Sequence, residues 1–172
     1  MKKILLIVFY LVLYLNIFSQ NSISPLNDNN KNLNSNLNQD SLQVVLNDSI
    51  YINRFCNSCS SWIPTSKDYS VIDKIILKAI TENKDIYKLE KLNVNTYRNY
   101  FKQLVCYIDE KNDSIVYINA LCYDSNFLFK DNEIYNWNKQ LIIVNDGGEC
   151  YWTIKINISK HSFFDFYVND DI

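Results

Sequence analysis

Glycine, proline and histidine are scarce in this chain. Its 172 residues include two glycines, two prolines and one histidine. Two adjacent glycines can build neither a phosphate-binding P-loop nor the G-x-G-x-x-G turn of dinucleotide-binding proteins. A Ser-His-Asp or Cys-His arrangement could use only His161, and the sequence contains no G-x-S-x-G motif. The sequence therefore offers no nucleotide-binding loop and no set of residues typical of nucleophilic catalysis.

An excess of positive charge is also absent. The chain has 17 lysines and arginines against 19 acidic residues, and no segment forms a basic stripe. We therefore expect no nucleic-acid partner. His161 has no partner at metal-ligand spacing, and a zinc site would need Cys56, Cys59 and two further cysteines brought together. We expect no metal ion and no cofactor.

The N-terminus has the pattern of a secretory signal peptide. Lys2 and Lys3 precede an apolar run, Ile4–Phe18, that is too short to cross a bilayer. We predict a signal peptide over residues 1–19, with cleavage after Ser19 or Gln20. The protein would then be exported across the inner membrane and be periplasmic, at the cell surface or secreted. The alternative is an uncleaved signal anchor, and only in that case do we expect contact with a membrane.

Residues 20–41 are rich in asparagine and poor in large apolar side chains. Such a segment cannot bury enough surface to offset the entropy lost on ordering. We predict that it is a flexible tether, followed by a single domain over residues 42–172.

One helix is strongly predicted, over Thr65–Asn83. Thr65 and Asp68 have the spacing of a capping box, and Asn83 is a suitable C-terminal stop. Apolar residues recur at helical spacing and form one continuous stripe: Ile72, Ile75, Ile76, Ala79 and Ile80. This stripe must pack against the rest of the domain.

Alternating residues predict strands before and after this helix. Leu42–Ile52 suggests one or two short edge strands, and Asn53–Pro64 a loop. Tyr100–Ile108 and Ile115–Tyr123 form a predicted hairpin that is partly apolar on both faces. The outer face must therefore be covered by other residues or serve as a binding surface.

The C-terminal third predicts a three-stranded meander. Leu141–Val144 would pair with Tyr151–Ile158 through a turn at the two glycines, because such turns need positive φ. Trp152, Ile154, Ile156 and Ile158 alternate toward one face. In a third strand, Phe163–Val168, the residues expected on one side are Phe164, Phe166 and Val168.

Together these elements predict an α+β fold, in which one amphipathic helix packs on a mainly antiparallel sheet of about five strands. Cystatin-like rolls have this element order, which is an analogy of fold and implies no function.

Four segments carry a resemblance to a group of proteins: the Ile-rich helix, Tyr117–Cys122, Val144–Trp152 and Tyr167–Asp171. In these the domain resembles uncharacterised small secreted proteins of Bacteroidota, and the Asp-Gly-Gly segment is the most specific part. The resemblance covers the region after the tether. It implies an exported protein and carries no activity.

The five cysteines cannot all pair with one another. Cys56 and Cys59 form a C-x-x-C, which in an exported chain is typical of a structural disulfide, although a redox role is the alternative. Among Cys106, Cys122 and Cys150, the simplest pair is Cys122–Cys150. At least one thiol should stay free, and a free cysteine is commonly a small core residue.

Aromatic residues suggest where a partner could bind. Residues 124–140 form a long insertion, and such insertions are usually functional or mobile. The expected contact residues lie in this insertion and on the outer face of the sheet: Phe127, Phe129, Tyr135, Trp137, Tyr107 and Tyr117. The alternative is that they build a second small core. We expect a non-catalytic interaction module whose partner is a protein or a cell-envelope component; the alternative is a thiol-disulfide redox protein using Cys56 and Cys59.

Overall fold

A computed structural model describes residues 42–122 and 136–170, all of which belong to one compact unit. The predicted signal peptide and tether lie outside the described residues. The elements are β1 (Gln43–Val45), α2 (Ser49–Ile52), β2 (Ser60–Ser61), α3 (Ser66–Tyr87), η4 (Tyr97–Asn99), β3 (Phe101–Ile108), β4 (Ser114–Leu121), η6 (Gly148–Cys150), β5 (Tyr151–Asn157) and β6 (Ser162–Val168).

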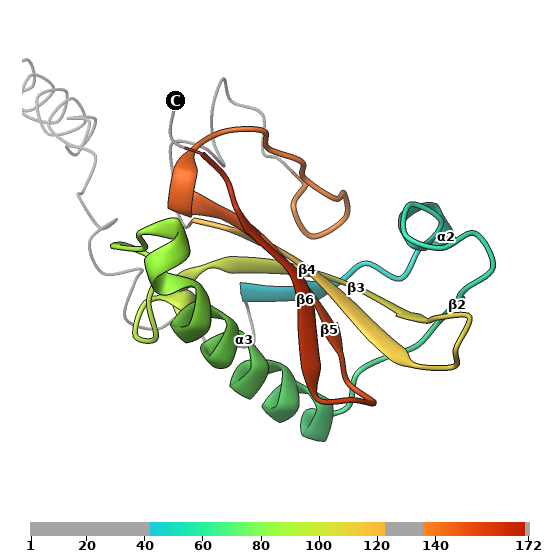
Figure 1. Cartoon of the computed structure of the whole chain (residues 1–172). Coiled ribbons are helices and arrows are strands. Elements are labelled where there is room, and N and C mark those ends of the chain that lie inside the picture. The colour runs from blue at the N-terminus through green and yellow to red at the C-terminus, as the bar shows by residue number, and fades with distance from the viewer. Residues whose placement is uncertain (1–41, 123–135, 171–172) are drawn as a thin grey trace, which may run out of the picture. The chain divides into compact units, whose positions relative to one another are not determined.

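The strands form one six-stranded sheet with the order β1-β3-β4-β5-β6, and β2 pairs with the end of β3. All pairings are antiparallel except that of β1 with β3. The single long helix, α3, lies on one side of this sheet, and the short helix α2 lies toward the other side (Figure 1). The predicted α+β fold, with one amphipathic helix on a mainly antiparallel sheet, is confirmed.

Helix α3 begins with the predicted capping box. The Thr65 side chain and backbone both bond the Asp68 carboxylate, at 2.7 and 2.8 Å. The helix does not end at Asn83 as predicted: Asn83 lies within α3, and its side-chain amide donates to the Ala79 carbonyl oxygen at 2.9 Å. The helix continues to Tyr87 and ends at Lys88, whose φ of 51° is left-handed.

The predicted isoleucine stripe of α3 packs on the sheet. Every member of the stripe is buried, and Ile76 is completely inaccessible to solvent. The stripe contacts apolar side chains of β3, β4 and β5, which include Leu104, Ile118 and Ile154. Trp152, Ile154, Ile156 and Ile158 share this face, as their alternation predicted.

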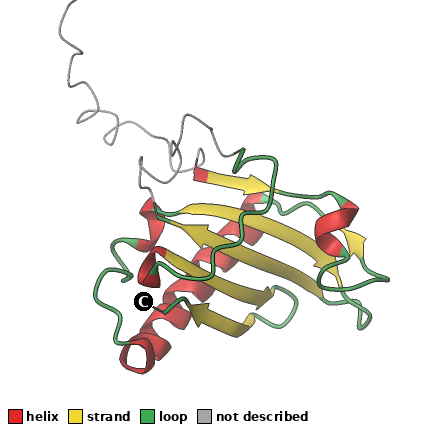
Figure 2. Ribbon diagram, turned by 90° about the horizontal axis from the view of Figure 1, so that it is seen from above, coloured by secondary structure: helices red, strands yellow, loops and turns green. Residues whose placement is uncertain are grey.

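The opposite face of β3 and β4 carries a second core. Val105, Tyr107 and Ile115 are buried there under Leu46 and Ile52, which flank or belong to α2. Beside it, Phe101 and Leu121 pack with Leu42 in a third cluster. Figure 2 shows α3 crossing the sheet on one side and loops passing over the other side.

Two buried amides hold the segment 137–142 against this outer face. The Gln103 side chain donates to the carbonyl oxygens of Trp137 and Gln140, and it accepts from Ile142 N–H at 2.9 Å. Asn119 donates to the Ile142 carbonyl oxygen at 2.6 Å and to Gln103. The outer face of the predicted hairpin is therefore covered in this region.

The predicted pairing of Leu141–Val144 with the strand at Tyr151 is wrong. One edge of β5 pairs with β4 over seven residue pairs, Ile115↔Asn157 to Leu121↔Tyr151, and the other edge pairs with β6, so no position is left for another strand. Positive φ at the glycines is confirmed, at 93° for Gly147 and 55° for Gly148. These angles lead the chain into η6 and not into a hairpin.

A β-bulge changes the side that Phe164 faces. Asp165 has a φ of 52°, and the pairing of β5 with β6 shifts register between Thr153 and Lys155. Phe166 and Val168 are buried as predicted, whereas Phe164 is 41% exposed and Phe163 packs against the core instead. The expectation that Phe164 shares the buried side was wrong because alternation does not anticipate an inserted residue.

The segment Leu42–Ile52 contains one strand and one helix. The strand β1 confirms the predicted edge strand, and its partner β3 is parallel to it. The second apolar cluster forms the short helix α2, whose N-terminus is capped by the Asp48 carboxylate accepting from Ile50 N–H at 2.9 Å.

Truncation of Ile76 tests the packing of α3. Because Ile76 is fully buried, Ile76→Ala should lower the free energy of unfolding by about 2–5 kcal/mol. Ile86→Ala is the matched control in the same helix, since Ile86 is 72% exposed, and it should change stability by less than about 0.5 kcal/mol. Equal urea midpoints for the two variants would contradict the packing described.

A side chain at Gly147 tests the left-handed turn. A Cβ there would lie 2.5 Å from a ring carbon of Tyr151, and the φ of 93° is unfavourable for any L side chain. Gly147→Val should destabilise the domain by about 1–2 kcal/mol or more. Lys155→Val, on a strand, should change the melting temperature less than Gly147→Val, because valine suits strands and the ion pair of Lys155 with the exposed Asp165 contributes little. A Gly147→Val variant that melts with wild type would show that the turn tolerates another conformation.

Candidate functional site

A polar groove lies between α3 and the strands β1 and β3, and we call it the Lys102 groove. Its volume is about 430 Å³, and its lining residues are Gln43, Ser66, Tyr69, Ser70, Asp73, Arg98 and Lys102. The four residues from α3 recur at positions i, i+3, i+4 and i+7, so they form a stripe along one side of the helix. This stripe lies beside the isoleucine stripe.

Lys102 is the unusual member of this groove. On β3 it pairs with Gln43 of β1 and Ala120 of β4, and its alternation with Leu104 directs it to the side of the sheet that faces α3. Only 3% of Lys102 is exposed, and it is the one lysine or arginine that is buried among the described residues. The strand therefore places an ammonium group at the margin of the apolar core.

The described residues around the Lys102 ammonium group meet only part of its hydrogen-bonding capacity. Its Nζ donates to the Tyr100 carbonyl oxygen at 3.0 Å and lies 5.8 Å from the centre of the Tyr97 ring. An ammonium group has three hydrogens to donate. No carboxylate of the described residues lies within ion-pair distance of it. The pKa of Lys102 is lowered to about 8, chiefly by burial, while Asp73 acts to raise it and the positive charge of Arg98 acts to lower it.

Arg98 and Asp73 are held in place on the groove. The Arg98 Nε donates to the Tyr97 hydroxyl at 2.8 Å, and its terminal nitrogen lies 3.5 Å from the Asp73 carboxylate. The bond to Tyr97 is the main reason that the pKa of Arg98 is raised. About half of each charged side chain is exposed, at 50% and 41%, so a ligand in the groove could reach both.

Sequence reasoning missed this groove. Lys102 alternates with Leu104 and Cys106 on the side of β3 that faces the core, and these two neighbours are apolar. A lysine in such a row is the one feature of the sequence that could have indicated the groove. In the sequence, Ser70 and Asp73 stand out only as polar residues outside the apolar stripe of the predicted helix. The contribution of Gln43 could not be anticipated, because it depends on the parallel pairing of β1 with β3.

The predicted aromatic contact residues are placed elsewhere. Phe127, Phe129 and Tyr135 lie outside the described residues. Tyr107 is only 5% exposed, and Tyr117 is half-buried with its ring 4.3 Å from that of Phe55. Trp137 is half-buried and packs against Phe101, with ring centres 4.7 Å apart. The described members thus lie in the outer clusters, and their role in binding stays a prediction.

Both candidate disulfides are formed. Cys56 joins Cys59 in the loop after α2, and Cys122 joins Cys150. Cys106 is free and buried in the core, and burial raises the pKa of its thiol to about 12, so this thiol is not a nucleophile at neutral pH.

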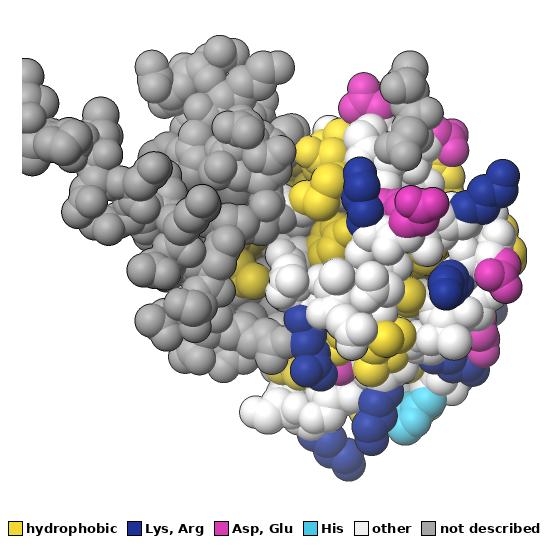
Figure 3. All heavy atoms as spheres, turned by 90° about the vertical axis from the view of Figure 1, so that its left-hand side faces the viewer, with side chains coloured by type: hydrophobic (Ala, Val, Ile, Leu, Met, Phe, Trp, Pro, Cys, Tyr) yellow, Lys and Arg dark blue, Asp and Glu magenta, His cyan; other side chains and the backbone are white. Residues whose placement is uncertain are grey.

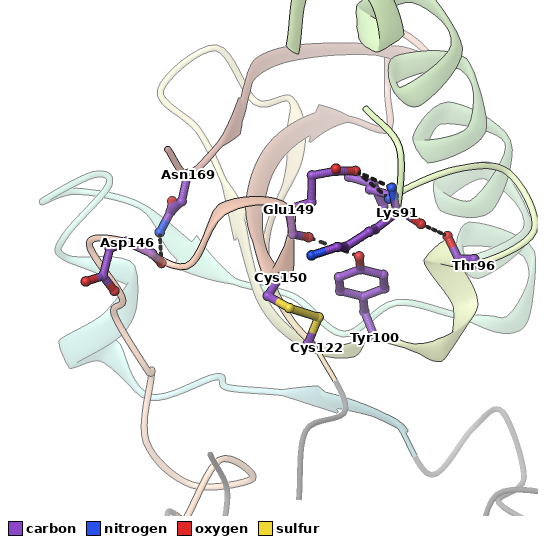
Figure 4. The surroundings of a disulfide bond; sticks show 9 residues. Lys91, Thr96, Tyr100, Cys122, Asp146, Glu149, Cys150 and Asn169 are labelled. Atoms are coloured by element: carbon purple, nitrogen blue, oxygen red, sulfur yellow. Dashed lines mark hydrogen bonds between the residues drawn. A yellow bond between two sulfur atoms is a disulfide. The ribbon is translucent and has the colours of Figure 1, made fainter. Parts of the chain in front are cut away.

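Glu149, next to Cys150 in η6, anchors η6 to the loop after α3. Its carboxylate accepts from the backbone N–H groups of Glu90, Lys91 and Leu92 at 2.6 to 3.1 Å (Figure 4). The Tyr100 hydroxyl donates to the Glu149 carbonyl oxygen at 3.0 Å. These bonds occupy the carboxylate in a structural role, which removes it as a candidate acid or base.

The remaining surface offers less specific chemistry. In the face shown in Figure 3, lysine and arginine side chains are interspersed with carboxylates and apolar groups. No three side chains of metal-ligand type come together within residues 42–122 and 136–170. In the same ranges, no helix combines the length and the apolar character needed to cross a membrane.

Comparison with known proteins finds no relative: no protein family, curated protein or solved structure matches this chain. The Lys102 groove is therefore interpreted from its own geometry.

The pH dependence of stability tests the burial of Lys102. Its folded pKa of about 8 lies below the usual 10.5, so between these values the unfolded chain binds more protons and stability should rise with pH. Tyr100 and Cys106 have raised pKa values and act in the opposite direction at higher pH. The comparison is therefore made with Lys102→Met, and the stability of wild type relative to this variant should rise by about 2 kcal/mol from pH 7.5 to 9.5.

Urea unfolding at a series of pH values measures this difference. Lys78→Met, which removes an exposed lysine of α3, controls for the loss of a surface charge. A difference between wild type and Lys102→Met that does not change with pH would mean that the Lys102 ammonium is solvated in the folded protein.

Proposed function

We propose that this chain is an exported, non-catalytic binding module whose ligand enters the Lys102 groove. The observation that carries the proposal is the buried Lys102 ammonium, which lines the groove with one hydrogen bond to the protein and no ion-pair partner among the described residues.

The energetics of Lys102 favour a role in binding over a role in stability. Burying an unpaired charge is costly, and an apolar side chain of similar volume at such a position is often neutral or stabilising. The neighbours of Lys102 on the same side of β3, Leu104 and Cys106, are apolar and completely buried. A lysine next to them that lines a groove is in the position expected for recognition of a ligand.

The cysteines support export. Disulfides form and persist in oxidising compartments, and the described residues contain two of them. Together with the predicted signal peptide over residues 1–19, they support a location beyond the inner membrane. The ligand of the groove is then part of a protein or of a cell-envelope component.

The alternative function is thiol-disulfide exchange through Cys56 and Cys59. Their disulfide is half-buried in a loop, so reductants could reach it. In thioredoxin-like proteins the reactive cysteine benefits from a helix N-terminus. Cys56 instead follows the C-terminal end of α2, where its N–H donates to the Ile52 carbonyl oxygen at 3.0 Å. This position supports a structural role for the disulfide.

Native mass spectrometry can test the binding function. The mature domain would be incubated with a small-molecule, peptide and saccharide extract of the host cell envelope. Wild type should retain at least one defined adduct, and Lys102→Met should lose it while Lys78→Met keeps it. Circular dichroism of each variant verifies that the domain is folded.

Two results would contradict the proposal. One is the absence of any adduct, or adducts that Lys102→Met retains unchanged. The other is insulin reduction by the domain that disappears in Cys56→Ser, because that result would favour the redox function.

A further inference from the structure

We propose that the Lys102 groove recognises a ligand carrying one carboxylate, with the Lys102 ammonium and the Arg98 guanidinium as its two cationic contacts. This inference rests on the proposed binding function and specifies its ligand class.

The charges of the groove define the class. Among the described residues that line the groove, two are cationic, Lys102 and Arg98, and one is a carboxylate, Asp73, so these residues together carry one net positive charge. A ligand with a single negative charge neutralises it. A doubly charged phosphate would leave an unbalanced negative charge next to Asp73, and like charges in such proximity disfavour binding.

The hydrogen-bond donors of Lys102 and Arg98 that remain free within the described residues also favour a carboxylate ligand. Lys102 uses one of its three donors on Tyr100, and Arg98 uses its Nε on Tyr97 and one terminal nitrogen on Asp73. A carboxylate has two oxygens that can accept from an ammonium and from a guanidinium together. Such a ligand would also supply the counter-ion that the buried Lys102 lacks in the described part of the chain.

The rest of the groove is suited to a polar ligand. Ser66 and Ser70 place hydroxyl groups along one wall, and Gln43 places an amide on β1. Hydroxyl and amide groups can both donate and accept hydrogen bonds. The Ser70 hydroxyl already donates to the Ser66 carbonyl oxygen at 3.4 Å, so it is offered to a ligand as an acceptor. A carboxylate attached to a peptide backbone or to a sugar ring would match them, and the groove volume of about 430 Å³ accommodates a molecule of that size.

Chemical-shift titration by NMR can identify the class and its source. The peptide probe is N-acetyl-Ala-Ala with a free C-terminus, and its control is the same dipeptide as a C-terminal amide. The sugar probe is glucuronate, with glucose as the control. At least one carboxylate should bind about ten-fold more tightly than its neutral control, and inorganic phosphate should bind more weakly than that carboxylate. The tighter carboxylate identifies the source, and the shifts should map to Asp73, Arg98 and Lys102.

Variants of the groove charges sharpen the test. Lys102→Met should weaken carboxylate binding about ten-fold or more, and Arg98→Gln, at a half-exposed position, should weaken it without threatening the fold. Asp73→Asn raises the net charge of the groove, so carboxylates should bind more tightly and phosphate should begin to compete. Lys78→Met should leave every affinity unchanged.

The outcomes separate this inference from the proposed function. Equal affinity for acids and neutral controls, tighter binding of phosphate, or no binding of either carboxylate at millimolar concentration would overturn carboxylate recognition. If an envelope adduct still depended on Lys102 in that case, the binding function would stand and only the ligand class would be wrong.

Discussion

The architecture depends on a sheet whose central strands, β3 and β4, carry buried apolar side chains on both faces. Each face must be removed from water, because exposed apolar area of that extent opposes folding. Helix α3 covers one face with its isoleucine stripe, and α2 with the segments on either side of it covers much of the other. The buried amides of Gln103 and Asn119 then hold the chain at 137–142 over the outer face. The Cys56–Cys59 disulfide closes the loop that follows α2, and the Cys122–Cys150 disulfide joins the residue after β4 to η6.

Lys102 is the point where this arrangement departs from simple burial. It stands on the face that α3 covers, next to side chains that are completely buried, and α3 contributes a polar stripe beside its apolar one at that position. Local conflict between burial and charge is most often found where a protein binds or reacts. Helix α3 therefore stabilises the domain with its apolar stripe and forms one wall of the groove with its polar stripe.

The elements that local patterns determine were predictable from the sequence. Helix α3, its capping box and the hairpin of β3 and β4 follow from residues that are neighbours in the chain, and both disulfides agree with the expected pairs. Leu141–Val144 was assigned wrongly because its composition suits a strand, while pairing is decided by β4, which is distant in sequence. The bulge at Asp165 depends on a single residue with positive φ, which no alternation reveals. The groove combines residues from β1, α3, η4 and β3, so only the exceptional lysine at position 102 could have indicated it.

The proposed function depends on Lys102 being a buried ammonium group that has no carboxylate of the described residues beside it. Selective observation of its Nζ and neighbouring methylene signals by NMR during a pH titration measures this directly. The groups that face it, Asp73, Arg98 and Tyr97, would be followed in the same experiment. The account predicts a titration midpoint near the pKa of about 8 that burial produces. A midpoint near the usual 10.5 would show a solvated or paired lysine and would contradict the account.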